Sequence, residues 1–300
     1  MQRLKNWIEA FRLRTLFLAL ASVITGGLLP VREGLFRPLV FILTLITTVF
    51  LQILSNLAND YGDSEKGTDN ENRVGPLRSV QSGKITHQEM KRMIIAFVLL
   101  SLISGLLLLY ISFPEEKFPE LVLFFFLGIA AIWAAIKYTV GKGAFGYSGL
   151  GDFFVFIFFG LVGVAGSYYV QTLMLDIRIF LPALTLGLFS VGVLNLNNMR
   201  DIENDKIHRK HTIPVRLGLK RAKNYHISLI TLGWLSAVLY LSLSYCFVFN
   251  LIFLLAMPLF VVHLQKVIKR EGASLDPLLR ELSLSTFLFS VLFAVSFLIC

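Results

Sequence analysis

Two clusters of acidic and amide side chains each follow a strongly apolar segment, and their residue types suit metal-assisted chemistry. The first cluster contains Asn59, Asp60, Asp63 and Asp69. The second contains Asn198, Asp201 and Asp205. Carboxylates beside a bilayer are costly to keep there, so they are candidates for a functional site. Because Mg²⁺ prefers oxygen ligands and often bridges to phosphate groups, two such clusters predict a Mg²⁺ site for a phosphorylated substrate.

The charge balance of the clusters favours a diphosphate held through metal ions. The aspartates alone would repel a diphosphate, whereas two Mg²⁺ ions would turn that repulsion into a bridge. The expected metal ligands are Asp60, Asp63, Asp69, Asp201 and Asp205. The side chains expected to bind the diphosphate, by amide or charged hydrogen bonds, are Asn59, Lys66, Arg73, Arg78, Asn198, Arg200 and Lys206. A solvated loop position is the alternative for each basic residue.

A metal-bound diphosphate next to an apolar segment favours one type of reaction. If the diphosphate is esterified to an allylic chain, its departure leaves an allylic cation, and catalysis needs charge stabilisation and positioning but no protein nucleophile. An aromatic face can stabilise the cation, so Tyr138 joins the expected catalytic aspartates, with Tyr61 and Tyr147 as further candidates. Membrane-interface tyrosines are the alternative. The sequence contains no Ser-His-Asp, Cys-His, P-loop or zinc-binding pattern.

The segments that must position these residues are transmembrane helices. Apolar residues make up 56% of the chain, charged residues 16%, and the mean hydropathy is +0.72, whereas a soluble domain carries about 25% charged residues. The sequence therefore predicts an all-α integral membrane protein whose first span is retained rather than cleaved. Nine spans are long enough to cross the hydrocarbon core. They are expected at 15–31, 38–58, 93–112, 119–137, 151–171, 178–198, 226–246, 249–265 and 282–300.

The distribution of basic residues predicts the orientation of these spans. With the N-terminus in the cytoplasm, 24 Lys and Arg residues fall in inside segments. The four outside residues are Arg32, Arg37, Lys117 and Arg178. This bias predicts a multi-pass protein surrounded by membrane lipid, with its C-terminus on the outer side. It also accounts for the net charge of +9 without nucleic acid, which we exclude as a partner.

The order of the spans indicates one helical bundle, a single domain covering residues 1–300. Only two inside loops are long, 59–92 and 199–225, and each begins with an acidic cluster. Each cluster follows the second span of a group of four, which predicts an internal duplication of a four-helix unit plus a ninth helix. The polar residues before each cluster recur at steps of three and four, so they share a helix face that should point into the bundle. Hydrogen bonding between helices explains one or two of these amides, but not two clusters of carboxylates.

At these residues the chain resembles the UbiA family of intramembrane prenyltransferases. The family carries two Asp-rich motifs at the inside ends of helices 2 and 6 of a nine-helix bundle. Residues 59–63 (Asn-Asp-x-x-Asp) and 201–205 (Asp-x-x-x-Asp) match those motifs. The family pattern places a third Asp where this chain has Gly67, and Asp69 comes two residues later. The resemblance covers nearly the whole chain.

Longer matching segments resemble the branch of this family that prenylates 1,4-dihydroxy-2-naphthoate in menaquinone synthesis. They are 12–15, 56–69, 73–78, 146–152, 197–205 and 212–218. The branch implies Mg²⁺-dependent transfer of a polyprenyl chain from polyprenyl diphosphate to that naphthoate in the bacterial inner membrane, with loss of CO₂, to give demethylmenaquinol. Asp152 belongs to a branch-specific Gly-Leu-Gly-Asp stretch, and it either orients the aromatic acceptor or caps a helix.

Three other functions share some of these features. A sister enzyme of the family would prenylate another acceptor, such as 4-hydroxybenzoate. A cation-coupled transporter would also carry intramembrane acids, but near the bilayer midplane within broken helices. A lipid-headgroup transferase would share the acids and the metal, but its Asp-Gly-x-x-Ala-Arg pattern is missing.

Overall fold

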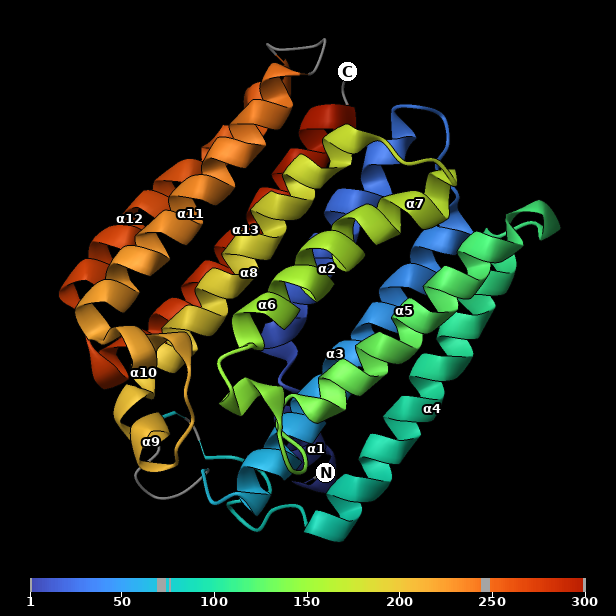
Figure 1. Cartoon of the computed structure of the whole chain (residues 1–300). Helices are drawn as coiled ribbons and strands as arrows, with labels where there is room; N and C mark the ends of the chain where they lie inside the picture. The colour runs from blue at the N-terminus through green and yellow to red at the C-terminus, as the bar shows by residue number, and fades with distance from the viewer. Residues whose placement is uncertain (1, 69–73, 76, 244–248, 299–300) are drawn as a thin grey trace.

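The structure, a computed structural model, describes residues 2–68, 74–75, 77–243 and 249–298, without the side chains of 249 and 250. Within these residues the chain forms helices and turns but no strand, and nine helices are long and apolar enough to cross a membrane. Figure 1 shows the helices side by side in one bundle. Two predicted site residues, Asp69 and Arg73, lie outside the described residues.

The spans follow one another in chain order. The first four are α2 (Leu13–Leu28), α3 (Pro38–Glu65), α4 (His87–Ser112) and α5 (Phe118–Lys137). The fifth combines α6 (Gly151–Val155), the π-helical η4 (Phe156–Gly166) and α7 (Ser167–Thr172). The last four are α8 (Phe180–Arg200), α11 (Leu219–Ser242), η6 (Phe249–Ala256) with α12 (Met257–Lys269), and α13 (Asp276–Leu298). Three short helices, α1 (Gln2–Phe11), α9 (Ile202–Ile207) and α10 (Ile213–Leu217), complete the fold.

The predicted spans are confirmed, and several helices extend beyond them. α3 continues to Glu65 rather than ending at 58, so Asp60 and Asp63 stand on a helix where a loop was expected. α4 begins ahead of the predicted residue 93 because Thr86 and Glu89 form a capping box. Hydropathy misses these turns because their polar residues continue the helix outside the hydrocarbon core.

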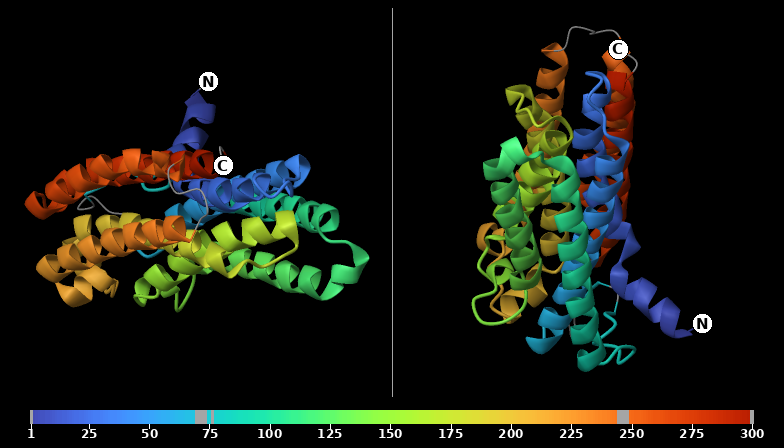
Figure 2. Two further views of the ribbon diagram at one scale, coloured as in Figure 1. Left: turned by 90° about the horizontal axis from the view of Figure 1, so that it is seen from above. Right: turned by 90° about the vertical axis from the view of Figure 1, so that its right-hand side faces the viewer.

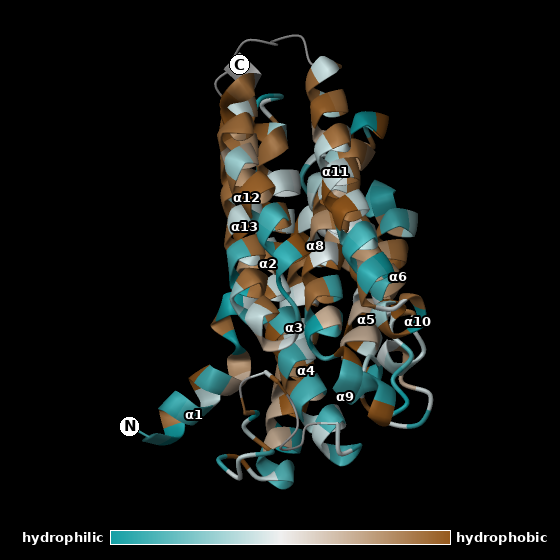
Figure 3. Ribbon diagram, turned by 90° about the vertical axis from the view of Figure 1, so that its left-hand side faces the viewer, coloured by the Kyte–Doolittle hydropathy of each residue, from teal (hydrophilic) through white to brown (hydrophobic). Residues whose placement is uncertain are grey.

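Both acidic clusters lie at the same end of the bundle, which we call the aspartate end. α9 and the end of α3 lie there in Figure 1, and Figure 3 shows hydrophilic residues gathered at that end below predominantly apolar spans. An internal duplication requires such a placement, but the duplication itself stays a prediction from the sequence.

The two halves of the bundle are packed differently. In the second half an aromatic core fills the space between α8, α11, α12 and α13, and it includes Phe189, Phe260 and Phe289. α8 approaches η4 closely at two glycines, because a Cβ on Gly160 would lie 2.9 Å from the Cα of Gly187. In the first half, α5 packs on α3 and α4 and leaves much of its surface exposed. Two smaller apolar clusters pack this half, and a cavity, described next, lies among its helices.

Candidate active site

An apolar cavity of about 270 Å³ lies between α2, α3, α4, α5 and the α6–η4 span. Aliphatic and aromatic side chains such as Leu106, Phe124 and Phe158 form most of its wall. Its polar lining residues are Gln52 on α3, several Ser and Thr side chains, and Tyr138, which follows α5 and lines the part nearest the aspartate end. Such a lining suits a hydrocarbon chain whose polar end leaves the cavity at Tyr138.

The first acidic cluster occupies the last turns of α3 beside the loop that follows α5. The Asp63 carboxylate accepts a hydrogen bond of 2.7 Å from the hydroxyl of Tyr147. The loop approaches the helix at Gly62, where a Cβ would lie 2.7 Å from the backbone carbon of Thr139. The Thr139 hydroxyl also donates to the Asn59 side chain at 3.3 Å. Glycine at position 62 therefore allows the loop to bring its tyrosines to the aspartates.

Asp60, on the same helix, faces the chain that follows the cluster. It is 1% exposed, and one of its carboxylate oxygens accepts a hydrogen bond of 3.1 Å from the backbone N–H of Ser79. Because Arg78 is the preceding residue and is half-buried, the structure brings this predicted diphosphate ligand to the Asp60 side of the site.

The second acidic cluster surrounds the junction of α8 and α9. Arg200 donates to both carboxylate oxygens of Asp201, at 2.9 and 2.6 Å, and both side chains are buried. The same guanidinium also donates to Asn197 at 2.9 Å and to Asp276 at the start of α13. These acceptors hold the Arg200 side chain on Asp201 in this structure, and its role in binding the diphosphate stays a prediction.

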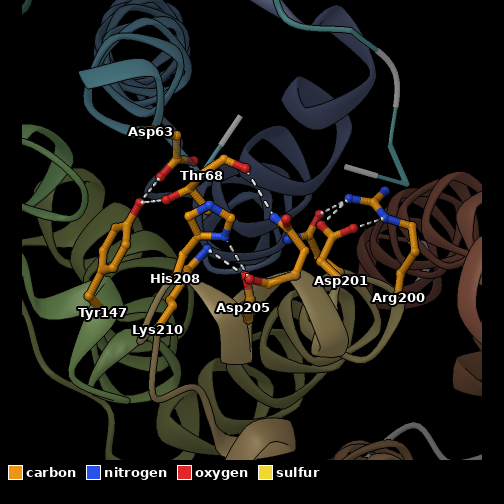
Figure 4. A network of polar contacts seen from close by, with 10 residues as sticks. Asp63, Thr68, Tyr147, Arg200, Asp201, Asp205, His208 and Lys210 are labelled. Carbon is orange, nitrogen blue, oxygen red and sulfur yellow. Dashed lines mark hydrogen bonds and ion pairs between the residues drawn. The ribbon is translucent and has the colours of Figure 1, made fainter. Parts of the chain in front are cut away.

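Lys210 and Tyr147 connect the two clusters (Figure 4). The Lys210 ammonium lies 3.7 Å from a carboxylate oxygen of Asp205 and 5.4 Å from the centre of the Tyr147 ring. Tyr147 in turn donates to Asp63, and its ring lies 3.9 Å below the Lys66 ammonium. The structure therefore places Asp63 and Asp205, 142 positions apart in the sequence, around one buried cation.

The electrostatics of this centre follow from burial and from like charges. Burial raises the pKa of Asp205 to about 6; the Lys210 ammonium opposes that rise, while the carboxylates of Asp201 and Asp63 add to it. Burial by itself would lower the pKa of Lys210, but the surrounding carboxylates outweigh it and raise that pKa. The site thus gathers carboxylates around Lys210, with Arg200 on Asp201 and Lys66 beside Asp63 as further cations.

The residues present fit a magnesium ion. Among the described residues, buried side-chain oxygens without a hydrogen-bond partner include one carboxylate oxygen each of Asp60 and Asp205 and the amide oxygen of Asn198. Leaving such oxygens unpaired is costly, and all three are the hard ligands that Mg²⁺ takes. No three His, Cys, Asp or Glu side chains of the described chain already form a metal cage. Substrate oxygens and water would have to complete the coordination.

The remaining predicted residues divide between the site and its surroundings. Tyr138 lies at the cavity, and burial raises its pKa, which the Lys210 ammonium partly opposes. Lys66 stacks over Tyr147 and donates to the Thr139 carbonyl at 2.7 Å, which keeps it beside Asp63. Lys206 forms an exposed ion pair with Glu203 at 2.8 Å, so the structure does not bring it to the carboxylates.

Asp152 lies in the first turn of α6 and accepts a hydrogen bond of 2.9 Å from the Tyr225 hydroxyl. The residue at the N-cap of α6 is Leu150, so Asp152 does not cap the helix. The other alternative, in which Asp152 orients the acceptor, stays a prediction.

Sequence reasoning missed Lys210, Thr68 and Asn204. Asn204 donates to the Thr68 carbonyl at 3.0 Å, and the Thr68 hydroxyl lies 2.6 Å from that of Tyr147, so both help to join the two clusters. Lys210 follows the second motif by five residues, but it is one of several adjacent cations there. What turns it inward is the left-handed backbone of Arg209, with φ of 53°, which the residue types do not indicate.

Comparison with known proteins gives one consistent result. Residues 19–297 match the model of the UbiA prenyltransferase family. The 1,4-dihydroxy-2-naphthoate octaprenyltransferase of Haemophilus influenzae is 44% identical over 99% of this chain and 97% of its own length. The enzyme of the same name from Escherichia coli is 42% identical over 98% of this chain and 95% of its own length.

Solved structures share the fold at much lower sequence identity. A UbiA homologue from Aeropyrum pernix, in its apo form, has a TM-score of 0.70 at 14% identity, over 92% of this chain and 96% of its own. One from Archaeoglobus fulgidus, bound to GPP and Mg²⁺, has a TM-score of 0.63 at 16% identity, over 96% of this chain and 100% of its own. At these identities the likeness concerns the fold, an all-helical membrane bundle.

Proposed function

Because the chain belongs to the UbiA prenyltransferase family, we propose that it transfers a polyprenyl chain from polyprenyl diphosphate to 1,4-dihydroxy-2-naphthoate. It is a polyprenyltransferase of menaquinone biosynthesis. The observation that carries the proposal is the meeting of both acidic clusters around Lys210 at the Tyr138 end of an apolar cavity. That arrangement suits a substrate with an anionic head and a long apolar tail.

The metal proposal rests on the unpaired oxygens of the site. Asp60, Asp63, Asp201, Asp205 and Asn198 would hold Mg²⁺ together with diphosphate oxygens, and the metal would supply charge neutralisation of the leaving group. Asp201 joins this set as the first acid of the second motif, and Arg200 orients its carboxylate. The solved homologue with bound GPP and Mg²⁺ supports this pairing of substrate and ion.

In this mechanism the protein's own residues bind the diphosphate and position the prenyl chain. Lys210, Lys66 and Arg78 grip the diphosphate by charged hydrogen bonds, and the cavity holds the tail and excludes water. The bond between the allylic carbon and the diphosphate oxygen breaks, and its electron pair leaves on the diphosphate. Tyr138 faces the carbon end of that bond, where an aromatic ring lowers the energy of an allylic cation.

The aromatic acceptor supplies the electron pair for the new carbon–carbon bond. The naphthoate ring carbon that bears the carboxylate forms the new bond to the allylic carbon, and CO₂ then leaves while its bonding pair restores the aromatic ring. We place the acceptor beside Asp152, whose carboxylate would orient a naphthol hydroxyl. Tyr225 holds that carboxylate through a hydrogen bond. The product of this sequence is demethylmenaquinol.

The cellular setting follows from the charge bias. Multi-pass insertion is indicated by the nine long apolar helices among the residues that the structure describes. We propose that the whole chain acts as one domain in a bacterial inner membrane, with the aspartate end and the N-terminus in the cytoplasm and the C-terminus outside.

The test uses purified protein in nanodiscs with octaprenyl diphosphate and 1,4-dihydroxy-2-naphthoate. We expect a prenylated naphthoquinol and CO₂ in the presence of Mg²⁺, and neither after chelation or in the Asp60→Asn and Asp201→Asn variants. Glu203→Gln, an exposed acid on α9, is the matched control and should keep full activity. Product with 4-hydroxybenzoate but none with the naphthoate would contradict the acceptor assignment while keeping the metal mechanism.

A further inference from the structure

The helix α1 leaves the bundle at the aspartate end and runs away from the bundle axis (Figure 2, right). Its apolar residues recur at helical spacing and form one stripe. The protein covers one edge of this stripe, where Ala10 is buried and Trp7 and Phe11 pack against the core cluster of α3 and α4. The other edge is open, since Leu4 is 66% and Ile8 43% exposed. The described part of the chain therefore leaves half of an apolar helix face uncovered.

Polar contacts show which way the open edge points. The Asn6 side chain donates to the backbone carbonyl of Lys84 at 3.4 Å, and the Lys84 ammonium lies 2.6 Å from the Glu9 carboxylate. The loop that contains Lys84 lies beyond the ends of the spans at the aspartate end (Figure 2). At 100° per residue, Leu4 and Ile8 stand on the side of α1 opposite to Asn6, roughly 160° away. Leu4 and Ile8 therefore point away from that loop, toward the ends of the membrane-spanning helices.

A fixed bend holds α1 in this direction. Arg12 joins α1 to α2 in a left-handed backbone conformation, with φ of 50° and ψ of 58°. The N–H of Thr15 donates to the Arg12 carbonyl at 2.8 Å, and the Asn56 side chain donates to the Phe11 carbonyl at 2.9 Å. Asn56 stands on α3 one turn before Asp60. The hydrogen bond from Asn56 thus ties the end of α1 to the polar face of α3, the helix that carries the first acidic cluster.

The charge of this segment identifies the partner. The basic side chains of residues 2–14 are Arg3, Lys5, Arg12 and Arg14. The acidic one, Glu9, pairs with Lys84, and Arg3 pairs with Glu89, so Lys5, Arg12 and Arg14 supply the basic excess. An amphipathic helix with an apolar edge turned to the bilayer and a basic excess binds in the plane of an anionic membrane surface. We propose that α1 is an interfacial helix that binds anionic phospholipid at the aspartate end, with Leu4 and Ile8 at the acyl boundary, and that it sets the depth of the α3 site.

Spin labels on the full chain in nanodiscs test this proposal. Leu4→Cys is labelled in a background in which Cys246 and Cys300 are replaced by Ser, and Gln2→Cys, on the polar side of the same helix, is the matched control. Power saturation compares collisions with lipid-soluble O₂ and with a water-soluble nickel chelate. The Leu4 label is expected to favour O₂ several-fold and the Gln2 label to favour the chelate. Replacing neutral lipid with phosphatidylglycerol is expected to deepen the Leu4 label.

Three results would overturn the proposal. Equal exposure of the two labels to the nickel chelate in both lipids would mean that α1 lies in water. Equal depth of the Leu4 label in neutral and anionic nanodiscs would remove the headgroup preference. Dipolar coupling between Leu4 labels without lipid contact would make a second copy of the chain the occupant of this face. Substrate turnover plays no part in the readout, so the outcome is independent of the prenyltransferase assignment.

Discussion

The two acidic clusters look alike in sequence, but the protein holds them very differently. Asp201 is buried and forms a bidentate ion pair with Arg200. The Arg200 guanidinium also donates hydrogen bonds to Asn197 and Asp276. Asp63 is half-buried and accepts its hydrogen bond from a neutral tyrosine hydroxyl. A buried ion pair resists rearrangement, whereas a bond to a hydroxyl exchanges readily for a metal or for water. Asp201 is therefore set before substrate arrives, and Asp63 is the acid that can adapt to it, whereas Asp60 in the same cluster is buried and bonded to Ser79.

Removing Lys210 should have the largest effect, because it connects the two clusters. Lys210→Met leaves Asp205 buried without its cation, and breaking a buried pair in this way costs about 3–5 kcal/mol of folding free energy. Chemical unfolding in detergent would measure the loss. Adding Asp205→Asn to Lys210→Met should recover most of the stability but none of the activity. If the double variant were as unstable as Lys210→Met, the pair would not be the cause.

Neutralising an acid of the second cluster should affect turnover next most strongly. Asp205→Asn removes a carboxylate that we propose as a metal ligand while it keeps the shape of the side chain, and kcat should fall by about 10²–10³-fold, as for other preorganised charge-stabilising groups. The measurement is kcat in nanodiscs at saturating Mg²⁺. A fall of less than about threefold would remove Asp205 from the metal set.

Changing the contact of Asp63 should show mainly in substrate binding. Tyr147→Phe removes the hydrogen bond to Asp63 and keeps the ring under Lys66. A hydrogen bond to a charged group contributes about 1.5–3 kcal/mol, so we expect affinity for Mg²⁺ and diphosphate to weaken by about 10- to 150-fold. Titrations of Mg²⁺ against initial rate would measure this, with the exposed Tyr110→Phe as control. An unchanged Mg²⁺ dependence would mean that Tyr147 does not hold Asp63 in the working enzyme.

The smallest effect is expected at a residue that sequence and structure treat differently. Lys206 lies within the second motif, yet it pairs with Glu203 at the surface. Exposed pairs contribute about 0–1 kcal/mol, so Lys206→Gln should lower the free energy of unfolding by less than about 1 kcal/mol and change kcat/KM by less than about twofold. A large fall in diphosphate affinity would restore Lys206 to the site, as the sequence predicted.

Much of the molecule follows from the sequence alone, because hydropathy and charge act locally. The nine spans, the common end for both clusters and the family were all predictable from apolar length, the Lys and Arg bias and two motifs. The ends of the helices were harder to predict, because α3 continues through Asp60 and Asp63. The polar turns beyond the hydrocarbon core are stabilised by caps and tertiary contacts, which hydropathy does not measure.

The roles of individual cations were decided by tertiary structure. Arg200, Lys206 and Lys210 are near neighbours of the same motif, and the sequence gives no means of ranking them. The fold turns Lys210 inward through the left-handed backbone at Arg209, commits Arg200 to Asp201, and leaves Lys206 in solvent. The physical reason is that a side chain's charge is local information, whereas its partner is supplied by segments that only folding brings near.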